Sequence, residues 1–150
     1  MAFKQKAVKV RKFETEKGII LGGFAGAAAD ALTLFERFES KLEEFEGDLT
    51  RAVVELAKEW RIDKYLRNLE ALLALMDKKN AFIVSGDGNV IQPDGPIISI
   101  GSGGGFAQAA ATAYLKSSTY SAKKVVEKSL QIAADLCIYT NDSITVLECK

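Results

Sequence analysis

The stretch "IILGGFAGAAADALTLFERFESKLEEF", residues 19–45, joins an apolar strand-like run to an amphipathic helix. Three glycines, at positions 22, 23 and 26, stand at the junction. Beyond them the apolar residues recur at helical spacing, at Ala31, Leu34, Phe35, Phe38, Leu42 and Phe45. Charged residues fill the positions between them, so the pattern predicts a helix with one buried stripe and one face in water.

The residues around this stretch extend the pattern on both sides. Alternating side chains over residues 7–13 predict a strand, and residues 14–18 form a charged turn. Residues 18–24 predict a second strand that pairs with the first as a hairpin. After the helix, "EGD" at 46–48 is a break, and a second helix is expected from about Leu49 to Leu69.

The second half of the chain predicts a strand block followed by another pair of helices. Strands are expected near 71–76, 81–85, 89–92 and 97–101, with turn signals between them. Gly103 opens an alanine-rich helix to about Leu115, Ser121 is a candidate N-cap for a further helix, and residues 144–147 suit a last strand. Helix pair, strand block and helix pair indicate an α+β fold with helices layered on packed sheets, and not alternating βαβ units.

The amino-acid composition argues against several classes of function. The chain has 150 residues, so a single domain over 1–150 is expected, and its 20 basic and 20 acidic groups give no sign of nucleic acid binding. There is no histidine, and Cys137 and Cys149 lack C-x-x-C spacing, so we expect a reducing, cytoplasmic setting without a transition metal. No leader or membrane-spanning run is expected. An enzyme of this composition needs a base other than imidazole.

Two glycine-rich junctions share one design, an apolar strand, a glycine cluster and an alanine-rich helix: "LGGFAGAAADA" and "SIGSGGGFAQAAA". Three interpretations stay open. The backbone N–H groups at a helix N-terminus could hold an anion such as a nucleotide phosphate, although no Walker A motif is present. The glycines could serve close packing of helix on strand. Finally, a backbone N–H could stabilise the oxyanion of an acyl-transfer reaction.

Further segments carry a family resemblance: "GGFAGAAADALTLFERFESKLE", "VELAKEWRIDKYLRNLEALL", "GNVIQP", "IGSGGGFAQAAA" and "EKSLQIAADLCIYTN". Together they resemble the HslV (ClpQ) family of proteasome-like peptidase subunits over essentially the whole chain. The resemblance implies a four-layer αββα sandwich of the N-terminal nucleophile hydrolase type. It also implies two stacked hexameric rings, an HslU-type AAA+ ATPase as partner, and unfolded proteins as substrates. ATP is then consumed by the partner, with no nucleotide bound by this subunit.

The same resemblance assigns site residues. Lys9 matches the lysine beside the nucleophile, Gly23 the glycine whose N–H is the oxyanion donor, and Ser102 a serine beside the threonine amine. A neighbouring ammonium lowers the pKa of an α-amine, ordinarily near ~8, so that the amine can act as a base. Main-chain carbonyls of Ala134, Cys137 and Thr140 are implied ligands of a sodium ion.

The chain departs from the family at its start. Family members carry a catalytic N-terminal threonine and a nearby aspartate on two strands that precede the segment matching "AVKVRKF", whereas the first ten residues here contain no threonine. We therefore expect a chain that lacks the first two strands of the fold and is inactive as written. The alternative is a noncatalytic subunit that builds rings or binds the ATPase. Nucleotide binding through the glycine loops is the third possibility.

Overall fold

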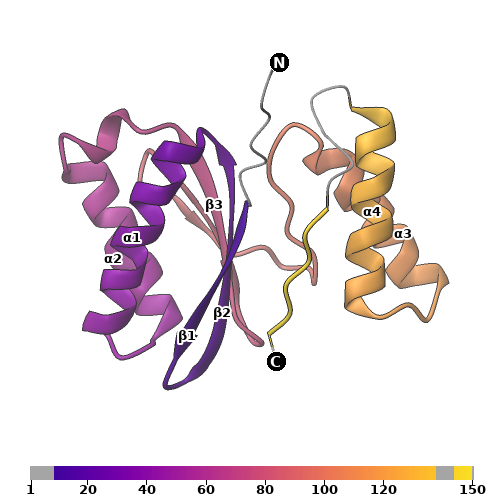
Figure 1. Cartoon of the computed structure of the whole chain (residues 1–150), viewed down its shortest axis with the longest axis horizontal. Coiled ribbons are helices and arrows are strands. Elements are labelled where there is room, and N and C mark those ends of the chain that lie inside the picture. Colours follow the sequence, from indigo (N-terminus) through magenta and orange to yellow (C-terminus); the bar gives the residue numbers. More distant parts are fainter. Residues whose placement is uncertain (1–8, 138–143, 150) are drawn as a thin grey trace, which may run out of the picture.

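The computed structural model describes residues 9–137 and 144–149 (Figure 1). Its elements, in chain order, are β1 (Val10–Thr15), β2 (Gly18–Gly26), α1 (Ala28–Glu44), α2 (Leu49–Ile62), the 3-10 helix η1 (Leu66–Asn68), β3 (Ala71–Met76), β4 (Ala81–Ser85), β5 (Val90–Ile91), α3 (Gly104–Ser117) and α4 (Ala122–Leu136). The five strands form one antiparallel sheet in the order β1-β2-β3-β4-β5. None of the helices in the described ranges is long and apolar enough to cross a membrane.

The predicted hairpin is confirmed. β1 and β2 pair in register from Val10 opposite Gly23 to Thr15 opposite Gly18, so the turn consists of only two residues, Glu16 and Lys17. The Thr15 hydroxyl donates to the Gly18 carbonyl and accepts from the Lys17 N–H, which closes that turn. β1 therefore extends two residues beyond its predicted end, because the turn is tighter than its charged sequence indicates. β2 also extends by two residues, at its other end, where Ala25 and Gly26 pair with β3.

Helices α1 and α2 cover one face of the sheet (Figure 1). The main core lies between these helices and the sheet. The predicted stripe on α1 is buried, apart from Phe45, which is half-buried at the helix end. Phe13 of β1 packs edge-on against the rings of Phe35 and Phe38. Trp60 of α2 is fully buried in the same core. The helical period of the sequence thus places the aromatic side chains of α1 on the face that packs against the sheet.

Gly22 supports the close-packing interpretation of the first glycine junction. A Cβ at this position would lie 3.0 Å from the Phe13 ring, 3.1 Å from the Phe35 ring and 3.3 Å from the Leu75 side chain. Such distances leave no room for a larger residue unless the aromatic core shifts. The space beside the β2 backbone is therefore filled by α1 and by the neighbouring strands.

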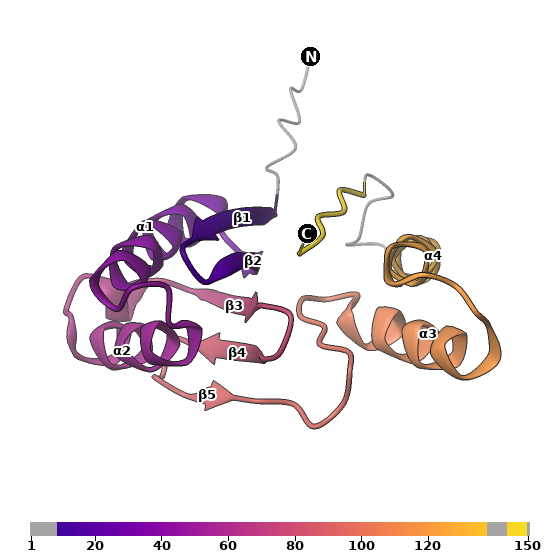
Figure 2. The same cartoon turned by 90° about the horizontal axis from the view of Figure 1, so that it is seen from below.

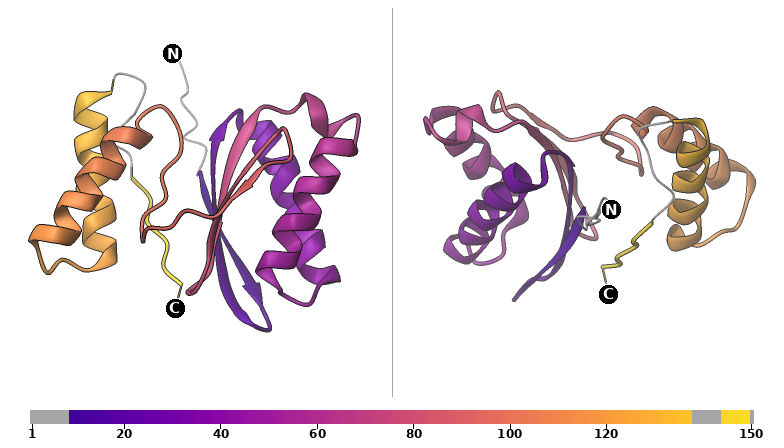
Figure 3. Two further views of the ribbon diagram at one scale, coloured as in Figure 1. Left: turned by 180° about the vertical axis from the view of Figure 1, so that it is seen from behind. Right: turned by 45° about the horizontal axis from the view of Figure 1, so that its top comes forward.

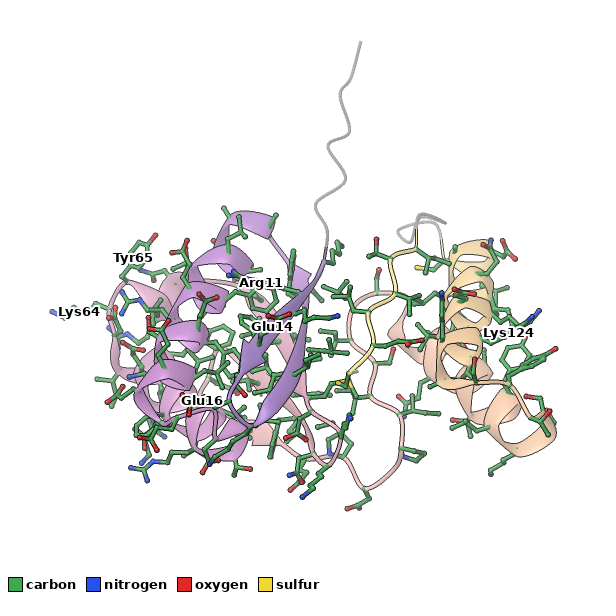
Figure 4. The ribbon with its side chains drawn as sticks, turned by 60° about the horizontal axis from the view of Figure 1, so that its bottom comes forward. Arg11, Glu14, Glu16, Lys64, Tyr65 and Lys124 are labelled. Atoms are coloured by element: carbon green, nitrogen blue, oxygen red, sulfur yellow. The ribbon has the colours of Figure 1, made fainter. Side chains whose placement is uncertain are left out.

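The second helix ends earlier than the sequence predicts. α2 stops at Ile62, and the expected continuation to Leu69 is instead a turn and the 3-10 helix η1. The reason is Asp63, whose carboxylate accepts the backbone N–H groups of Tyr65 and Leu66. A short acidic side chain that bonds its own backbone competes with the helix, so the chain leaves α2 and turns toward β3. Tyr65 is left at the outer end of this helix layer (Figure 4).

The other helix pair, α3 and α4, lies on the opposite side of the sheet (Figures 1 and 2). Its expected start signals are confirmed, since Gly103 precedes α3 and the Ser121 hydroxyl accepts the Lys124 N–H as N-cap of α4. The helices bury small residues against each other, among them Ala107, Ala111 and Ala133. Lys124 lies on the outer face of this pair, with its ammonium over the Tyr120 ring (Figure 4).

Two predicted strands are not formed. Residues 97–101 and 144–147 run between the sheet and the α3–α4 pair without joining a ladder in the described part of the chain (Figure 3). A strand exists only where its backbone groups find a partner, and both edges of the five-stranded sheet lie elsewhere, at β1 and β5. The observed layers are therefore helix pair, sheet, extended segments and helix pair.

Candidate active site

Both glycine junctions meet at one wide-open surface pocket of about 610 Å³, which is called the cavity below. It lies where β2 ends, where β3 begins and where the loop before α3 turns. The residues that line it are Lys9, Ala25, Gly26, Leu69, Glu70, Ala71, Leu72, Gly86, Gly101 and Ser102. The structure therefore brings Lys9 and Ser102, which are 93 positions apart in the sequence, to the same cavity. This is the arrangement that the resemblance implies.

Lys9 is held at the cavity through its backbone. Its carbonyl accepts the N–H of Phe24 over 3.1 Å, which continues the β1–β2 register by one residue. The side chain is exposed, and none of the ion pairs in the described ranges involves it. Lys9 is thus a cation on a fixed backbone, directed to the cavity that Ser102 reaches from the other side.

Gly23 does not line this cavity. In an antiparallel strand, the N–H groups of successive residues point to opposite neighbours. Because the Phe24 N–H points to β1, the N–H of Gly23 points the other way, toward its partner Ala74 on β3. There it belongs to the sheet and is not offered to a ligand. The geometry therefore counts against Gly23 as the donor that the resemblance implies.

Gly26, which the sequence analysis did not single out as a donor, is in the cavity wall. By the same alternation its N–H points to the β1 side, beyond Val10, where the described pairing of β1 with β2 ends. Its φ of +123° suits glycine alone. A Cβ there would lie 2.7 Å from the Glu70 carbonyl oxygen and 3.0 Å from the Ala71 Cα. The structure thus requires glycine at position 26.

Ser102 is on a tight turn that leads into α3. Gly101 has a φ of +95°, and the Gly104 N–H donates to the Gly101 carbonyl over 3.1 Å. The Ser102 side chain is exposed, and its hydroxyl makes no hydrogen bond to any other described residue. A serine beside glycine commonly bonds the backbone of its own loop, but this hydroxyl does not, so it can serve a bound molecule.

A family model described as proteasome subunit matches residues 2–149. The chain belongs to the proteasome family. Among its proteasome-family relatives is the ATP-dependent protease subunit HslV of Aquifex aeolicus (strain VF5), with 52% identity over 145 residues, 97% of this chain and 81% of that protein. Eukaryotic HslV from Trypanosoma brucei has a crystal structure that matches with a TM-score of 0.82 and 41% identity, over 95% of this chain and 84% of that one.

These matches establish the proteasome fold and a proteasome-like protease component homologous to HslV. The predicted fold class, an α+β N-terminal nucleophile hydrolase sandwich, is thereby confirmed. Within the described residues, the hydrogen-bonded strands form one sheet. Sequence reasoning gave no role to Gly26 and Glu70, which line the cavity, or to Asp30, whose carboxylate accepts the Glu70 N–H. A signal for Gly26 and Asp30 was present in "GAAAD", where a glycine stands four residues before an aspartate in the first turn of α1, whereas no local pattern marks Glu70.

Two of the three expected sodium ligands lie where α4 of this proteasome-family chain ends. Ala134 is in the last turn of α4, Cys137 is its buried C-cap residue, and Thr140 lies outside the described residues. The Ala133 carbonyl already accepts the Cys137 N–H, whereas the Ala134 carbonyl is among the last four of the helix, which lack a partner within it. Helix-end carbonyls with partial negative charge fit a hard cation. The described side chains form no acidic or thiolate metal cluster.

Proposed function

We propose that this chain is the peptidase subunit of a two-component ATP-dependent protease, in which an HslU-type AAA+ ATPase delivers unfolded proteins. The observation that carries the proposal is the meeting of Lys9 and Ser102 at one cavity in a chain 52% identical to an HslV subunit. The proposal includes two stacked hexameric rings and a cytoplasmic location. ATP is hydrolysed by the partner, and no nucleotide is bound here.

The proposed chemistry is N-terminal threonine catalysis; the first ten residues contain no threonine, and the experiment below adds it. Its hydroxyl attacks the substrate carbonyl while its own α-amine takes the proton. The backbone of Lys9 is fixed by the bond from the Phe24 N–H, and its ammonium keeps that amine neutral by disfavouring a second positive charge. Ser102 lines the same cavity, where its hydroxyl can pass the proton between amine and leaving group. This scheme needs no histidine.

The oxyanion that forms on the substrate carbonyl requires a backbone N–H donor. Gly23 was the candidate from the resemblance, and Gly26 is the candidate from the geometry, because it lines the cavity and its N–H is directed away from β3. We propose Gly26 as the donor. The glycine then has two functions, since it admits the substrate to the backbone and lets β2 pass close to Glu70.

A sodium ion held by the carbonyls of Ala134, Cys137 and Thr140 completes the proposal. Its contribution is to neutralise the partial negative charge where α4 ends, which fixes the chain beyond that helix. The ion takes no part in the steps assigned to Lys9 and Ser102.

The experiment adds the two N-terminal strands of the family, with a processed threonine in front, to this chain. We expect rings by size, hydrolysis of a fluorogenic peptide, and stimulation by an HslU-type ATPase with ATP. The unextended chain is the matched control and is expected to show no turnover. Folded rings that stimulate the ATPase yet cleave nothing would instead establish the noncatalytic alternative.

A further inference from the structure

Among the described residues that line the cavity, Glu70 is the only carboxylate and Lys9 is the only cation. Lys9 precedes β1 and Glu70 precedes β3, the two strands that flank β2. Two strand spacings of about 4.8 Å therefore place at least ~10 Å of sheet between their backbones. The cavity thus carries a positive charge on one wall and a negative charge on the other, with the end of β2 between them.

The backbone of Glu70 is fixed from two sides. The carboxylate of Asp30, in the first turn of α1, accepts the Glu70 N–H over 3.1 Å. On the other side, the Glu70 carbonyl packs so closely on Gly26 that a Cβ there would be 2.7 Å from the oxygen. These contacts occupy main-chain atoms only. They hold the residue in place while they leave its side-chain carboxylate uncommitted.

No ion pair within the described residues includes Glu70, and its side chain is exposed at the cavity. Some other acidic side chains are paired, for example Glu39 with Arg11 and Glu59 with Arg37, so what sets Glu70 apart is its place at the cavity and not the lack of an ion pair alone. A carboxylate on an anchored backbone, without a cation of its own, is suited to a cation that arrives with a ligand. The adjacent lining residues Leu69, Ala71 and Leu72 are apolar and can contact an aliphatic stem.

We infer that Glu70 is a specificity-determining residue that favours substrates with a lysine or arginine side chain close to the cleaved bond. The inference rests on the proposed function, because it assigns the cavity to a peptide substrate. The aliphatic part of the basic side chain lies along the apolar wall, and its charged end meets the Glu70 carboxylate. Lys9, on the opposite wall, opposes the same cation, so it restricts basic side chains to the Glu70 side.

The test compares peptides that differ in charge alone. A fluorogenic peptide with lysine at each position before the cleaved bond in turn is compared with its norleucine counterpart, which has the same aliphatic stem, in the extended enzyme. Exposed charge pairs contribute ~0.2–1 kcal/mol, so kcat/KM is expected to favour lysine by about 1.5- to 5-fold at one position. The preference is expected to weaken as salt rises.

Glu70→Gln is expected to bring the lysine-to-norleucine ratio close to one, and Glu70→Lys to reverse it. The matched control is Glu16→Gln, because Glu16 is in the β1–β2 turn, at the end of the hairpin away from Lys9, and should keep the ratio (Figure 4). Anisotropy of the labelled peptides with the unextended chain gives the same ratio without turnover. It also serves as the readout if a variant does not assemble.

The outcomes separate the two proposals. An extended enzyme that cleaves peptides with the same ratio in wild type and Glu70→Gln overturns the specificity inference and leaves the proposed function standing. Equal losses of kcat/KM for both peptides also overturn it, since they would show that Glu70 acts on Lys9 and not on the substrate. An assembled enzyme without turnover, together with a chain that binds neither peptide, overturns both.

Discussion

The carbonyl oxygen of Glu70 approaches Gly26 so closely that any Cβ on the glycine would lie 2.7 Å from it. This contact joins the end of β2 to the start of β3 at the cavity, where the two strands still pair as Gly26 opposite Ala71. Glycine at position 26 is therefore a requirement of the sheet itself, before any role in binding is considered.

Gly26→Ala is expected to destabilise the fold, because the new Cβ meets backbone atoms and the φ of +123° is unfavourable for alanine. Overpacking and backbone strain each cost ~1–3 kcal/mol. Gly23→Ala is the control, since its Cβ would lie 3.6 Å from the Lys9 carbonyl, an ordinary contact. Urea midpoints of the two variants check the prediction. Equal midpoints would show that the contact at Gly26 relaxes freely.

Gly23→Val tests the oxyanion assignment in the extended enzyme. Because the Gly23 N–H points to β3, we expect kcat to change by less than ~10-fold when the variant folds and assembles normally. Loss of one oxyanion donor typically costs ~10²–10³-fold in kcat. A fall of that size, with melting temperature and ring size unchanged, would restore Gly23 as the donor and remove Gly26 from the role.

Lys9→Ala is expected to lower kcat of the extended enzyme by ~10²–10⁴-fold, the usual contribution of general acid–base assistance. The melting temperature should barely change, because the Lys9 side chain is exposed and the bond from Phe24 uses its backbone. Lys12→Ala, an exposed lysine of the same strand, is the control for loss of charge. Wild-type turnover in Lys9→Ala would identify the lysine as an ordinary solvated strand residue.

The thiol of Cys149 is expected to react with iodoacetamide more slowly than an exposed thiol near pH ~8.5. Burial raises the pKa of Cys149 above its ordinary value, and the negative charge of Asp77 adds to the rise, while Lys78 and Lys12 lower it in part. The folded state thus keeps this proton to a higher pH than the unfolded state does. Its contribution to stability is therefore present below the ordinary thiol pKa and is lost as pH rises through the folded value.

The rate of alkylation of Cys149 against pH, followed by mass spectrometry, measures this shift. Asp77→Asn should move the profile to lower pH, because it removes a charge that disfavours the thiolate. Asp94→Asn is the control, because Asp94 is an exposed aspartate that is not among the charges that shift the pKa of Cys149. A profile for the wild type that matches a small-molecule thiol would show that residues 144–149 leave this position in solution.

The elements that the sequence predicted well are those governed by local patterns. The apolar period over residues 31–42 defines α1, and Ser121 marks the start of α4, since period and cap are properties of adjacent residues. Residues 97–101 have the same strand-like composition as β4, yet they form no ladder, because pairing depends on what lies beside them. Local sequence carries no information about such partners.

In the candidate site, too, some features could be predicted from the sequence and others depend on how distant segments pair. Lys9 and Ser102 were expected from the resemblance, and the structure places both at one cavity. The direction of a backbone N–H could not be predicted for Gly23, since it depends on the parity of the β1–β2 register and therefore on the exact length of the turn. The turn has two residues where five were expected. This difference changes which residues of β1 lie opposite those of β2.

The α3–α4 pair stands apart from the main core, which consists of β1–β4, α1, α2 and η1. Its own buried side chains are mostly small, while Phe106, Leu115 and Leu136 are exposed. Amide hydrogens of this pair should therefore exchange through local opening, well before those of β2 and β3, which exchange only when the sheet opens. If amide hydrogen exchange in α3 and α4 slows as the protein concentration rises, the residues that slow would show where one copy of the chain contacts another.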